Sequence, residues 1–464
     1  MMRIIIADIK GREGYLTKDT VVGGYGARLI PFSKVTAVYS YVKSAVLTLP
    51  SVQMAYLAAI AARRGHEVVY TRGKQVEGDV ALVLSSLVDY RSEIAWADIA
   101  RQRGIRVGFV GLAASKMSHL FAEHADFLIQ GEPESAMLQL AAGRRLEGMV
   151  ESPALPDLDV LPFPRWDLLN DRRNSWYGFG KRWGGNGFPV MASRSCPEFC
   201  TYCPHRILAA YRARKVKNIV DEIEWLCDRY SFPYVSFRDP LFTEKRDRCL
   251  ELCDEIQARG LNIQFEFETR LDRLDEELVE KLHRVGLRAI TFGVESVSPE
   301  TLRKVGRRPI PEAQQRAIID SCNRHGIGTV GFYVLGFLQD DWNSISATID
   351  YSIALGSTCA QFKVLTPYPG TPLWNRMEPL IYEKDWQKFD GFTPTFKHPS
   401  LSAEELRFLL GAAYTRFYMR PSYLANYLEI RNGRLRELIH ILDRKTSERH
   451  AANEMAAVSR TVTC

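Results

Sequence analysis

Residues 1–145 alternate short apolar runs with segments of helical periodicity, and this alternation limits the possible folds of the chain more than any other feature. Two of the helical segments, 51–65 and 93–104, end at Gly65 and Gly104, where a helix is expected to stop. Strand and helix signals in regular succession predict an open parallel sheet with helices on both faces. The predicted strands are RIIIAD (3–8), EVVYT (67–71), DVALVLSS (79–86), RVGFVGL (106–112) and DFLIQG (126–131).

A second series of the same kind begins near residue 188 and contains about six βα units. Six parallel strands with outer helices predict an incomplete β/α barrel, whose active site is expected at the carboxyl ends of the strands. The predicted strands are FPVMASRS (188–195), YVSFRD (234–239), IQFEFETR (263–270), AITFGVES (289–296), TVGFYVLG (329–336) and AQFKVLTPYPG (360–370).

A proline-rich segment separates the two series. SPALPDLDVLPFPRWDLL contains four prolines between residues 153 and 164, which predicts irregular structure there. A chain of 464 residues is also too long for one ordinary core. We therefore expect an α/β domain at 1–145, a linker at 146–185, a partial barrel at 186–375 and a helical C-terminal region at 376–464.

Charge and hydropathy limit the class of partner. The formal net charge is +6 and no long block of Lys and Arg is present, so nucleic acid is not an expected partner. The apolar run at the start is broken by Asp8 and Lys10, and no later segment has about 18 uncharged apolar residues. We expect neither a secretion signal nor a membrane span, and a cytoplasmic location. The sequence leaves the oligomeric state open.

The nine cysteines are unevenly distributed, because all lie from Cys196 onward and three of them, Cys196, Cys200 and Cys203, fall within eight positions. A tight cluster in a reducing compartment indicates metal binding or catalysis. Structural zinc normally has four ligands, and His205 is poorly placed to be the fourth. Three thiolates in a loop after a strand suit a cubic iron–sulfur cluster that leaves one iron open to a substrate.

This cysteine loop resembles the CxxxCxxC motif of the radical S-adenosylmethionine (SAM) superfamily. The resemblance implies a [4Fe–4S] cluster held by the three cysteines, with SAM chelated on the open iron and cleaved to methionine and a 5′-deoxyadenosyl radical. Tyr202 matches the aromatic position that lies against adenine in that family; a packed aromatic is the alternative. The electron would come from an external donor such as a flavodoxin or a ferredoxin.

The resemblance extends to about residue 375 and implies further SAM-binding positions at the strand ends. A carboxylate suits ribose hydroxyls and a guanidinium suits a carboxylate. A structural ion pair between Arg270 and one of the glutamates is the alternative. The residues implied near SAM are Asp239, Thr243, Glu268, Arg270, Glu295, Ser296, Gly336 and Leu365. Tyr333, if it faces inward from the fifth strand, could position the substrate or donate a hydrogen atom, although strand parity is uncertain by one residue.

The front segment, joined to such a barrel, resembles the cobalamin-binding domain of cobalamin-dependent radical SAM enzymes. The resemblance implies that the loops SSLVDY (85–90), GLAAS (111–115) and QGEPE (130–134) surround cobalamin. Asp8 has no histidine after it in a DxHxxG motif, so a domain that keeps this fold without the cofactor stays open. The implied cofactor-binding residues are Ser85, Ser86, Gly111, Gly131 and Glu132.

Two functions follow from the resemblance. The first is cobalamin-dependent methylation of an unactivated carbon in a small-molecule metabolite, in which methylcobalamin supplies the methyl group, one SAM remethylates cobalt and a second SAM yields the radical. The alternative is a radical dehydratase, epimerase or cyclase acting on a sugar or another secondary metabolite without cobalamin. Methylthiolation of tRNA is disfavoured because residues 1–195 contain no cysteine. The glycine-rich GGYGARL (23–29) lacks the context of a dinucleotide site and is expected in a loop near the domain interface.

Overall fold

A computed structural model describes residues 1–11, 14–18, 24–48, 51–169, 175–176, 187–230 and 233–421 of the chain. The chain divides into two compact units, Met1–Thr415 and Arg416–Cys464. Most of the expected linker beyond residue 169 and the end of the expected helical region, 422–464, lie outside the described residues, as does Gly23. Both six-stranded sheets belong to the first unit.

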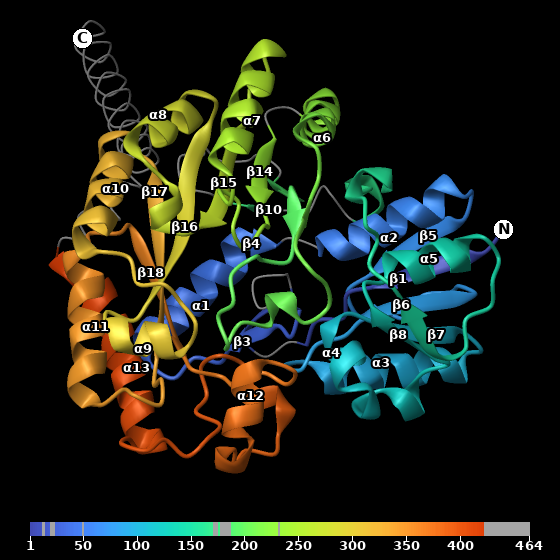
Figure 1. Ribbon diagram of the computed structural model, residues 1–464. Coiled ribbons are helices and arrows are strands. Elements are labelled where there is room, and N and C mark those ends of the chain that lie inside the picture. Colours follow the sequence, from blue (N-terminus) through green and yellow to red (C-terminus); the bar gives the residue numbers. More distant parts are fainter. Residues whose placement is uncertain are drawn as a thin grey trace, which may run out of the picture. The chain divides into compact units, whose positions relative to one another are not determined.

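The first sheet is parallel throughout, which confirms the expected α/β class (Figure 1). Its strand order, β5-β1-β6-β7-β8-β9, reverses direction of winding between β1 and β6. Ligands of such sheets bind beyond the carboxyl ends of the strands at this reversal. The strands are β1 (Arg3–Ala7), β5 (Glu67–Thr71), β6 (Val80–Leu84), β7 (Arg106–Val110), β8 (Phe127–Gly131) and β9 (Gly148–Ser152).

Four helices accompany this sheet, and the helical segments predicted at 51–65 and 93–104 form two of them, α2 and α3. The helices are α2 (Val52–Arg63), α3 (Tyr90–Gln102), α4 (Leu112–Lys116) and α5 (Glu134–Ala141). Strand β9 is an unexpected addition, because it pairs with β8 inside the segment 146–185 that was expected to be linker. The sheet therefore extends to Ser152, and the irregular chain begins at the prolines that come after it.

The second sheet also consists of six parallel strands, in the order β11-β14-β15-β16-β17-β18, which is their order along the chain. This is the topology of a partial (β/α)6 barrel, as expected. Its strands are β11 (Gly187–Val190), β14 (Tyr234–Phe237), β15 (Gln264–Thr269), β16 (Leu287–Glu295), β17 (Gly328–Leu335) and β18 (Cys359–Val364). Helices α6 (Val216–Arg229), α7 (Arg246–Ala258), α8 (Glu276–Arg284), α9 (Pro299–Lys304), α10 (Glu312–Arg324) and α11 (Trp342–Ala354) connect them.

Side-chain direction in this sheet follows the strand period of two. On β15 the burial alternates, with Phe265 and Phe267 fully covered and Glu266 and Glu268 half-exposed on the concave face. Register pairs Phe332 of β17 with Gln361 of β18, and both share that concave face. Polar and half-exposed side chains therefore gather inside the partial barrel, and the apolar ones pack under the helices.

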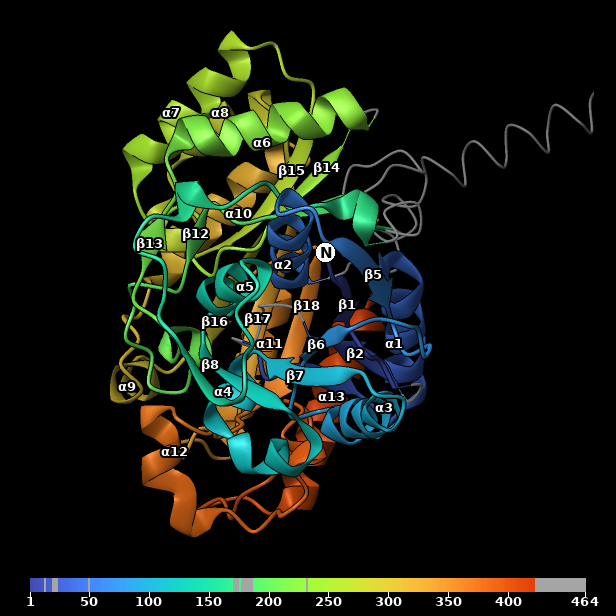
Figure 2. The same cartoon turned by 90° about the vertical axis from the view of Figure 1, so that its right-hand side faces the viewer.

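The segment before α2 was not anticipated and connects the two edges of the barrel. Helix α1 reaches β18, where the Lys43 Nζ atom donates to the Gln361 Oε1 atom over 2.7 Å. Strand β4 pairs with β10, which contacts β11 at the opposite edge. Figures 1 and 2 show this segment in dark blue. Its elements are β2 (Tyr15–Thr17), β3 (Ala27–Leu29), α1 (Lys34–Val46) and β4 (Leu47–Thr48), whereas β10 (Ser175–Trp176) comes later in the chain.

Residues from GGYGARL join the first sheet to the last part of the barrel. The Tyr25 hydroxyl donates to the Pro369 carbonyl over 2.6 Å, and the Tyr25 ring stacks on Tyr368 at 5.5 Å. Beyond β18 the chain forms α12 (Pro372–Met377) and α13 (Ala403–Tyr418). The remaining short strands are β12 (Ser193–Arg194) and β13 (Arg212–Ala213). Among the described residues, no helix combines the length and apolar character needed to cross a membrane.

Candidate functional site

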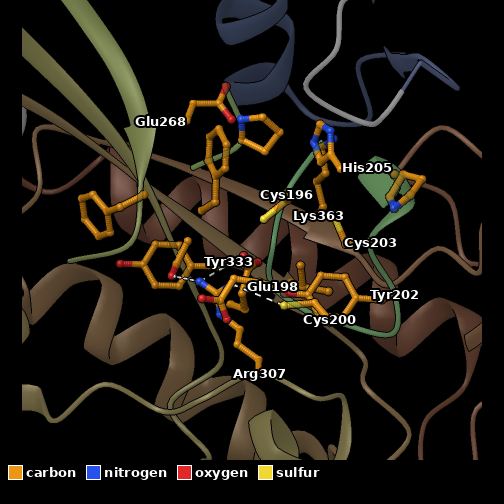
Figure 3. A pocket seen from close by; sticks show the side chains of 18 of the residues that line it. Cys196, Glu198, Cys200, Tyr202, Cys203, His205, Glu268, Arg307, Tyr333 and Lys363 are labelled. Atoms are coloured by element: carbon orange, nitrogen blue, oxygen red, sulfur yellow. Dashed lines mark hydrogen bonds and ion pairs between the residues drawn. The ribbon is translucent and has the colours of Figure 1, made fainter. Parts of the chain in front are cut away.

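A pocket lies at the carboxyl ends of the barrel strands, where the topology predicts one (Figure 3). It contains about 1160 Å³ of space not filled by protein atoms, its open mouth included. Cys196, Cys200 and Cys203 line one side, and residues from β15 to β18 line the other. The three clustered cysteines and the strand ends therefore belong to one site.

Backbone contacts hold the cysteine loop against the barrel. The Thr201 amide donates to the Val305 carbonyl over 2.8 Å, and the Leu373 amide donates to the Thr201 carbonyl over 2.9 Å. Just before the loop, Ser195 has a φ of 65°, a conformation that non-glycine residues adopt rarely. The loop is thus fixed by the segments that come after β16 and β18, and Ser195 turns the chain into the pocket.

The three thiols line the same pocket. Within the part of the chain that the structure describes, no three His, Cys, Asp or Glu side chains converge on one metal-ion position. Burial raises the pKa of the Cys196 thiol to about 11 and also raises the pKa of Cys203. Bound metal deprotonates such thiols. The Arg307 guanidinium lies 3.9 Å from the Cys200 Sγ atom and would offset the charge of a thiolate there.

Three charged side chains expected near SAM, Glu268, Arg270 and Glu295, line this pocket. Each pairs with a residue other than the ones that the alternative of a structural ion pair between Arg270 and a glutamate would require. Glu268 lies 3.6 Å from Arg238, Glu295 lies 3.8 Å from Arg307, and Arg270 forms two bonds to Asp272 of 3.0 and 2.9 Å. No ion pair joins Arg270 to either glutamate in the described residues. Burial raises the pKa of Glu295, opposed by the charge of Arg307.

Tyr202 and Leu365 also line the pocket, and Tyr202 packs against other apolar side chains. Its ring meets Phe337 edge-on at 5.6 Å and packs against a small apolar cluster that includes Leu365. Burial raises the pKa of the Tyr202 hydroxyl, so it stays protonated. A flat apolar ligand could lie against this cluster.

Four residues expected near SAM lie outside the described pocket lining and have structural contacts instead. Asp239 is fully buried and accepts hydrogen bonds from the Ala192 amide, over 3.0 Å, and from the Ser193 hydroxyl. It therefore holds the chain just before the cysteines. The others are Thr243, bonded to Thr269, Ser296, which accepts from the Ser298 amide, and Gly336, whose amide donates to Asp340.

Tyr333 contributes to the pocket wall, but its ring packs against other aromatic side chains and is almost fully covered. Its ring is 1% exposed and stacks at 5.2 Å on Phe362, which packs against Tyr414 of α13. The half-exposed residues on β17 are its neighbours Phe332 and Val334. The period of two on a strand therefore directs Tyr333 to the outer helices and Phe332 to the pocket.

Sequence reasoning missed two basic residues of the pocket. Arg307 comes after α9 and donates to the Gly293 carbonyl, and its only sequence signal is that it stands shortly after the fourth strand. Lys363 lies in AQFKVLTPYPG, between apolar residues of a predicted strand. Because successive side chains of a strand point to opposite faces, Gln361 and Lys363 could have been placed on the same face of that strand.

A second pocket, with about 800 Å³ of unfilled space, adjoins the first sheet. Leu84, Gly111 and Glu132, all at the carboxyl ends of strands of that sheet, line one side. Pro204, His205 and Pro240 line this pocket as well as the cysteine pocket. The two pockets are therefore neighbours across one wall, which comes from the barrel.

The expected cofactor residues of the front segment divide into two groups. Gly111 and Glu132 line the second pocket. Ser85, Ser86 and Gly131 lie outside its described lining: Ser85 donates to the Val110 carbonyl over 2.7 Å, and Ser86 donates to Glu93 over 2.6 Å. A side chain at Gly131 would meet the Ser152 carbonyl of β9 at 2.4 Å, so this glycine is required for strand packing.

A buried ion-pair network joins the first sheet to the start of the cysteine loop. Arg194 lies 2.7 Å from Glu134 and 3.3 Å from Glu132, and Arg212 also pairs with Glu132. Arg194 lies over the Tyr56 ring at 5.4 Å. Because these partners come from β12, β13 and the loop after β8, the network fixes the second pocket against the cysteine loop.

Comparison with known proteins agrees with this architecture. The family model described as the radical SAM superfamily matches residues 190–350. An uncharacterized methyltransferase of Pyrococcus horikoshii is 27% identical, over 64% of this chain and 68% of that protein. The bacteriochlorophyllide d C-12(1)-methyltransferase of Chlorobaculum tepidum is 24% identical, over 71% of this chain and 72% of that protein.

A solved structure shares the fold over most of the chain. It is the radical S-adenosylmethionine methyltransferase TsrM from Kitasatospora setae with cobalamin and a [4Fe-4S] cluster bound. The match has a TM-score of 0.55 at 16% identity and covers 79% of this chain and 82% of that one. With three cysteines in the family's spacing at the mouth of a partial barrel, the chain carries a radical SAM domain and is a radical SAM enzyme, which implies a [4Fe–4S] cluster and SAM as its cofactors.

Proposed function

We propose that the protein is a cobalamin-dependent radical SAM methyltransferase that methylates an unactivated carbon of a small-molecule metabolite. The observation that carries this proposal is the wall shared by the two pockets, made by Pro204, His205 and Pro240. A cofactor in the second pocket would lie beside the site of radical formation. The two relatives and the solved structure, which are named as methyltransferases, support the same reading.

The residues of the second pocket fit a large flat cofactor. Gly24 and Gly111 have φ values of 98° and 105°, so bare backbone forms part of the wall in conformations that favour glycine. Ser51 and Ala209 add small side chains. The pocket also lies beyond the carboxyl ends of the strands on the β6 side of the winding reversal, where sheets of this kind bind ligands.

The chain's own residues have distinct tasks in this proposal. When bound, the cluster and SAM supply a radical and cobalamin supplies a methyl group. Cys196, Cys200 and Cys203 hold the cluster, and Arg307 offsets thiolate charge at Cys200. Glu295 and Arg270 line the space where the polar groups of SAM would bind. The barrel wall on one side and the cysteine loop on the other would shelter a radical formed in this space from side reactions.

The proposal is tested by reconstituting the cluster anaerobically, adding cobalamin, and removing the excess by gel filtration. We expect corrin absorption to stay with the protein, and S-adenosylhomocysteine to form beside 5′-deoxyadenosine when a substrate is turned over. A cluster-loaded protein that retains no cobalamin would contradict the proposal. It would favour the alternative of a radical dehydratase, epimerase or cyclase, whose product gains no methyl group.

We also propose that a small electron-transfer protein, a flavodoxin or a ferredoxin, reduces the cluster. Phe199, between two of the cysteines, is 73% exposed and lies under the Arg206 guanidinium at 3.7 Å. Arg303 and Lys304, next to the backbone that contacts the cysteine loop, are also exposed. An apolar residue among basic ones suits an acidic donor. A slower reduction of Phe199→Ser by flavodoxin, with unchanged reduction by dithionite, would support this docking site.

A further inference from the structure

Lys363 lines the cysteine pocket, and a second lysine, Lys43, lies close enough to interact with its charge. Lys363 lies on β18, two residues after Gln361, so both side chains share one face of the strand. Both residues line the cysteine pocket, and Figure 3 shows Lys363 among its lining residues. Lys43 comes from α1, and its Nζ atom donates to the Gln361 Oε1 atom over 2.7 Å.

Contacts with aromatic rings and with backbone hold both lysine side chains in place. The Lys43 Nζ atom lies 5.4 Å and 5.1 Å from the ring centroids of Tyr15 and Tyr39. The Lys363 Nζ atom lies 5.9 Å from the centroid of Phe392, and a side chain on Gly391 would meet the Lys363 stem at 3.1 Å. Contacts of this kind fix the direction of an otherwise flexible side chain. Lys363 is therefore held in the lining of the cysteine pocket, and the Lys43 ammonium group is held beside Gln361.

Neither lysine has a carboxylate within ion-pair distance among the residues that the structure describes. The acidic groups that face them already have other partners. Glu268 lies 3.6 Å from Arg238, and Glu295 lies 3.8 Å from Arg307. Asp390 accepts hydrogen bonds from the Phe392 and Thr393 amides over 2.7 and 2.8 Å. Both lysines are half-buried, and a partly desolvated cation without a close counter-ion is costly unless something else supplies the negative charge.

The pKa values of the two lysines agree with this electrostatic picture. Burial lowers the pKa of Lys43 to about 7, and the charge of Lys363 adds to that effect. Burial lowers the pKa of Lys363 to about 8, against the attraction of Asp390, Glu268 and Glu295. An anion bound between them would favour the charged form of both and restore ordinary protonation near pH 7.

We propose that Lys363 and Lys43 form an oxyanion-binding site for a carboxylate or phosphate group of the substrate. Lys363 contacts the oxyanion, and Lys43 orients Gln361 and adds a second positive charge. The reacting carbon of the substrate would lie toward the cysteines, on the same concave face. This inference rests on the proposed function, because it identifies the substrate class of that enzyme as an anionic metabolite.

Binding of simple oxyanions tests the proposal directly. Inorganic phosphate and acetate are titrated by calorimetry into the cluster-reconstituted protein saturated with SAM, so that the carboxylate of SAM already has its own partner. We expect at least one anion to bind, Lys363→Met to weaken that binding by about tenfold or more, and Lys363→Arg to keep it within about threefold. Lys217→Met, at an exposed lysine on α6, is the matched control and should bind as the wild type does.

Comparison of the phosphate and acetate titrations identifies which anionic group the substrate carries. Preference for phosphate over acetate assigns a phosphorylated substrate, and the reverse assigns a carboxylate. Binding that occurs only without SAM would overturn the proposal, because the lysines would then serve SAM. Equal binding by Lys363→Met and wild type would also overturn it.

Chemical labelling of the wild-type protein keeps the test valid if a variant fails to fold. Trinitrobenzenesulfonate modifies uncharged amines, so Lys363 and Lys43 should react faster near pH 8 than Lys217. We expect the anion that binds to protect Lys363, measured by peptide mass spectrometry with SAM present. Unprotected Lys363 would contradict the proposal. Cobalamin retention and S-adenosylhomocysteine formation are measured separately, so failure of the anion site is distinguishable from failure of the proposed function.

Discussion

The two pockets of this protein share a wall but are constructed differently. The cysteine pocket is made from reactive and charged side chains at the ends of barrel strands, among them three thiols, Glu295 and Arg307. The second pocket includes bare backbone at Gly24 and Gly111, and two of its lining side chains, Glu132 and Arg194, already pair with one another. The cysteine pocket can coordinate or pair with its ligands through side chains, and the second pocket would hold a ligand mainly through the shape of its wall.

This difference determines how each pocket should respond to mutation. A pocket that depends on side-chain chemistry fails when one ligand is removed, even if the fold persists. A pocket that depends on backbone shape fails when the backbone is strained or when its supporting ion pairs are broken. Substitutions at Cys200, Arg194 and Gly111 test this contrast, and one at Tyr333 tests the direction of a side chain.

The largest effect is expected for Cys200→Ala. Loss of one of three ligands should abolish cluster binding, because an alanine supplies no thiolate. We expect no absorption from the reconstituted cluster and no 5′-deoxyadenosine. Cys253→Ala is the matched control, since Cys253 is a buried thiol on the outer helix α7. It should keep the cluster and lose about 1 kcal/mol of stability. Residual SAM cleavage by Cys200→Ala would refute the ligand assignment.

The next largest effect is expected for Arg194→Met, on stability. The substitution leaves Glu134, whose side chain is 1% exposed, without its cationic partner. Unpairing a buried charge typically costs about 3–5 kcal/mol. Arg145→Met breaks an exposed pair, with side chains 72% and 65% exposed, and should cost less than about 1 kcal/mol. Urea unfolding measures both, and equal losses would show that the buried network adds no more than a surface pair.

The fold was largely predictable from sequence because both sheets repeat a strong pattern. Alternation of strand and helix signals located the strands of both sheets except β9, and proline density placed the break between them. β9 was missed because GMVES, with two buried or half-buried positions, lacks the apolar run of a central strand. The segment that includes α1 was missed because its role depends on pairing with β18 and β10, which lie far away in the sequence.

The site was predictable only where the spacing of residues along the chain is enough to identify a set of ligands. Three cysteines in eight positions define a ligand set before any fold is known. Lys43 and Lys363 could not be associated in this way, because 320 positions separate them and their proximity depends on the packing of α1 against β18, where Lys43 contacts Gln361. Asp239 was correctly placed at a strand end, but its carboxylate turned toward the Ala192 amide. Position on a strand therefore predicts proximity to a site more reliably than contact with its ligand.

A smaller effect is expected for Gly111→Ala, on cobalamin affinity. Gly111 has a φ of 105° on the wall of the second pocket, so alanine would strain or shift this backbone at a cost of about 1 kcal/mol or more. We expect cobalamin affinity to fall about tenfold, measured by equilibrium dialysis, while the cluster still forms. Gly143→Ala has a comparable φ of 89° with open space around it, and controls for strain alone. Equal affinity in both variants would show that the wall at Gly111 does not hold the cofactor.

The smallest effect is expected for Tyr333→Phe. The hydroxyl lies on the helix-covered face of β17, and the ring that stacks on Phe362 is retained in the variant. We expect SAM cleavage and product formation within about twofold of wild type, and a stability change of about 1 kcal/mol or less. The adjacent Phe332→Ala should instead lower product formation, because Phe332 lines the pocket on the concave face. A loss of activity in Tyr333→Phe larger than that in Phe332→Ala would reverse the strand parity and return Tyr333 to a role in catalysis.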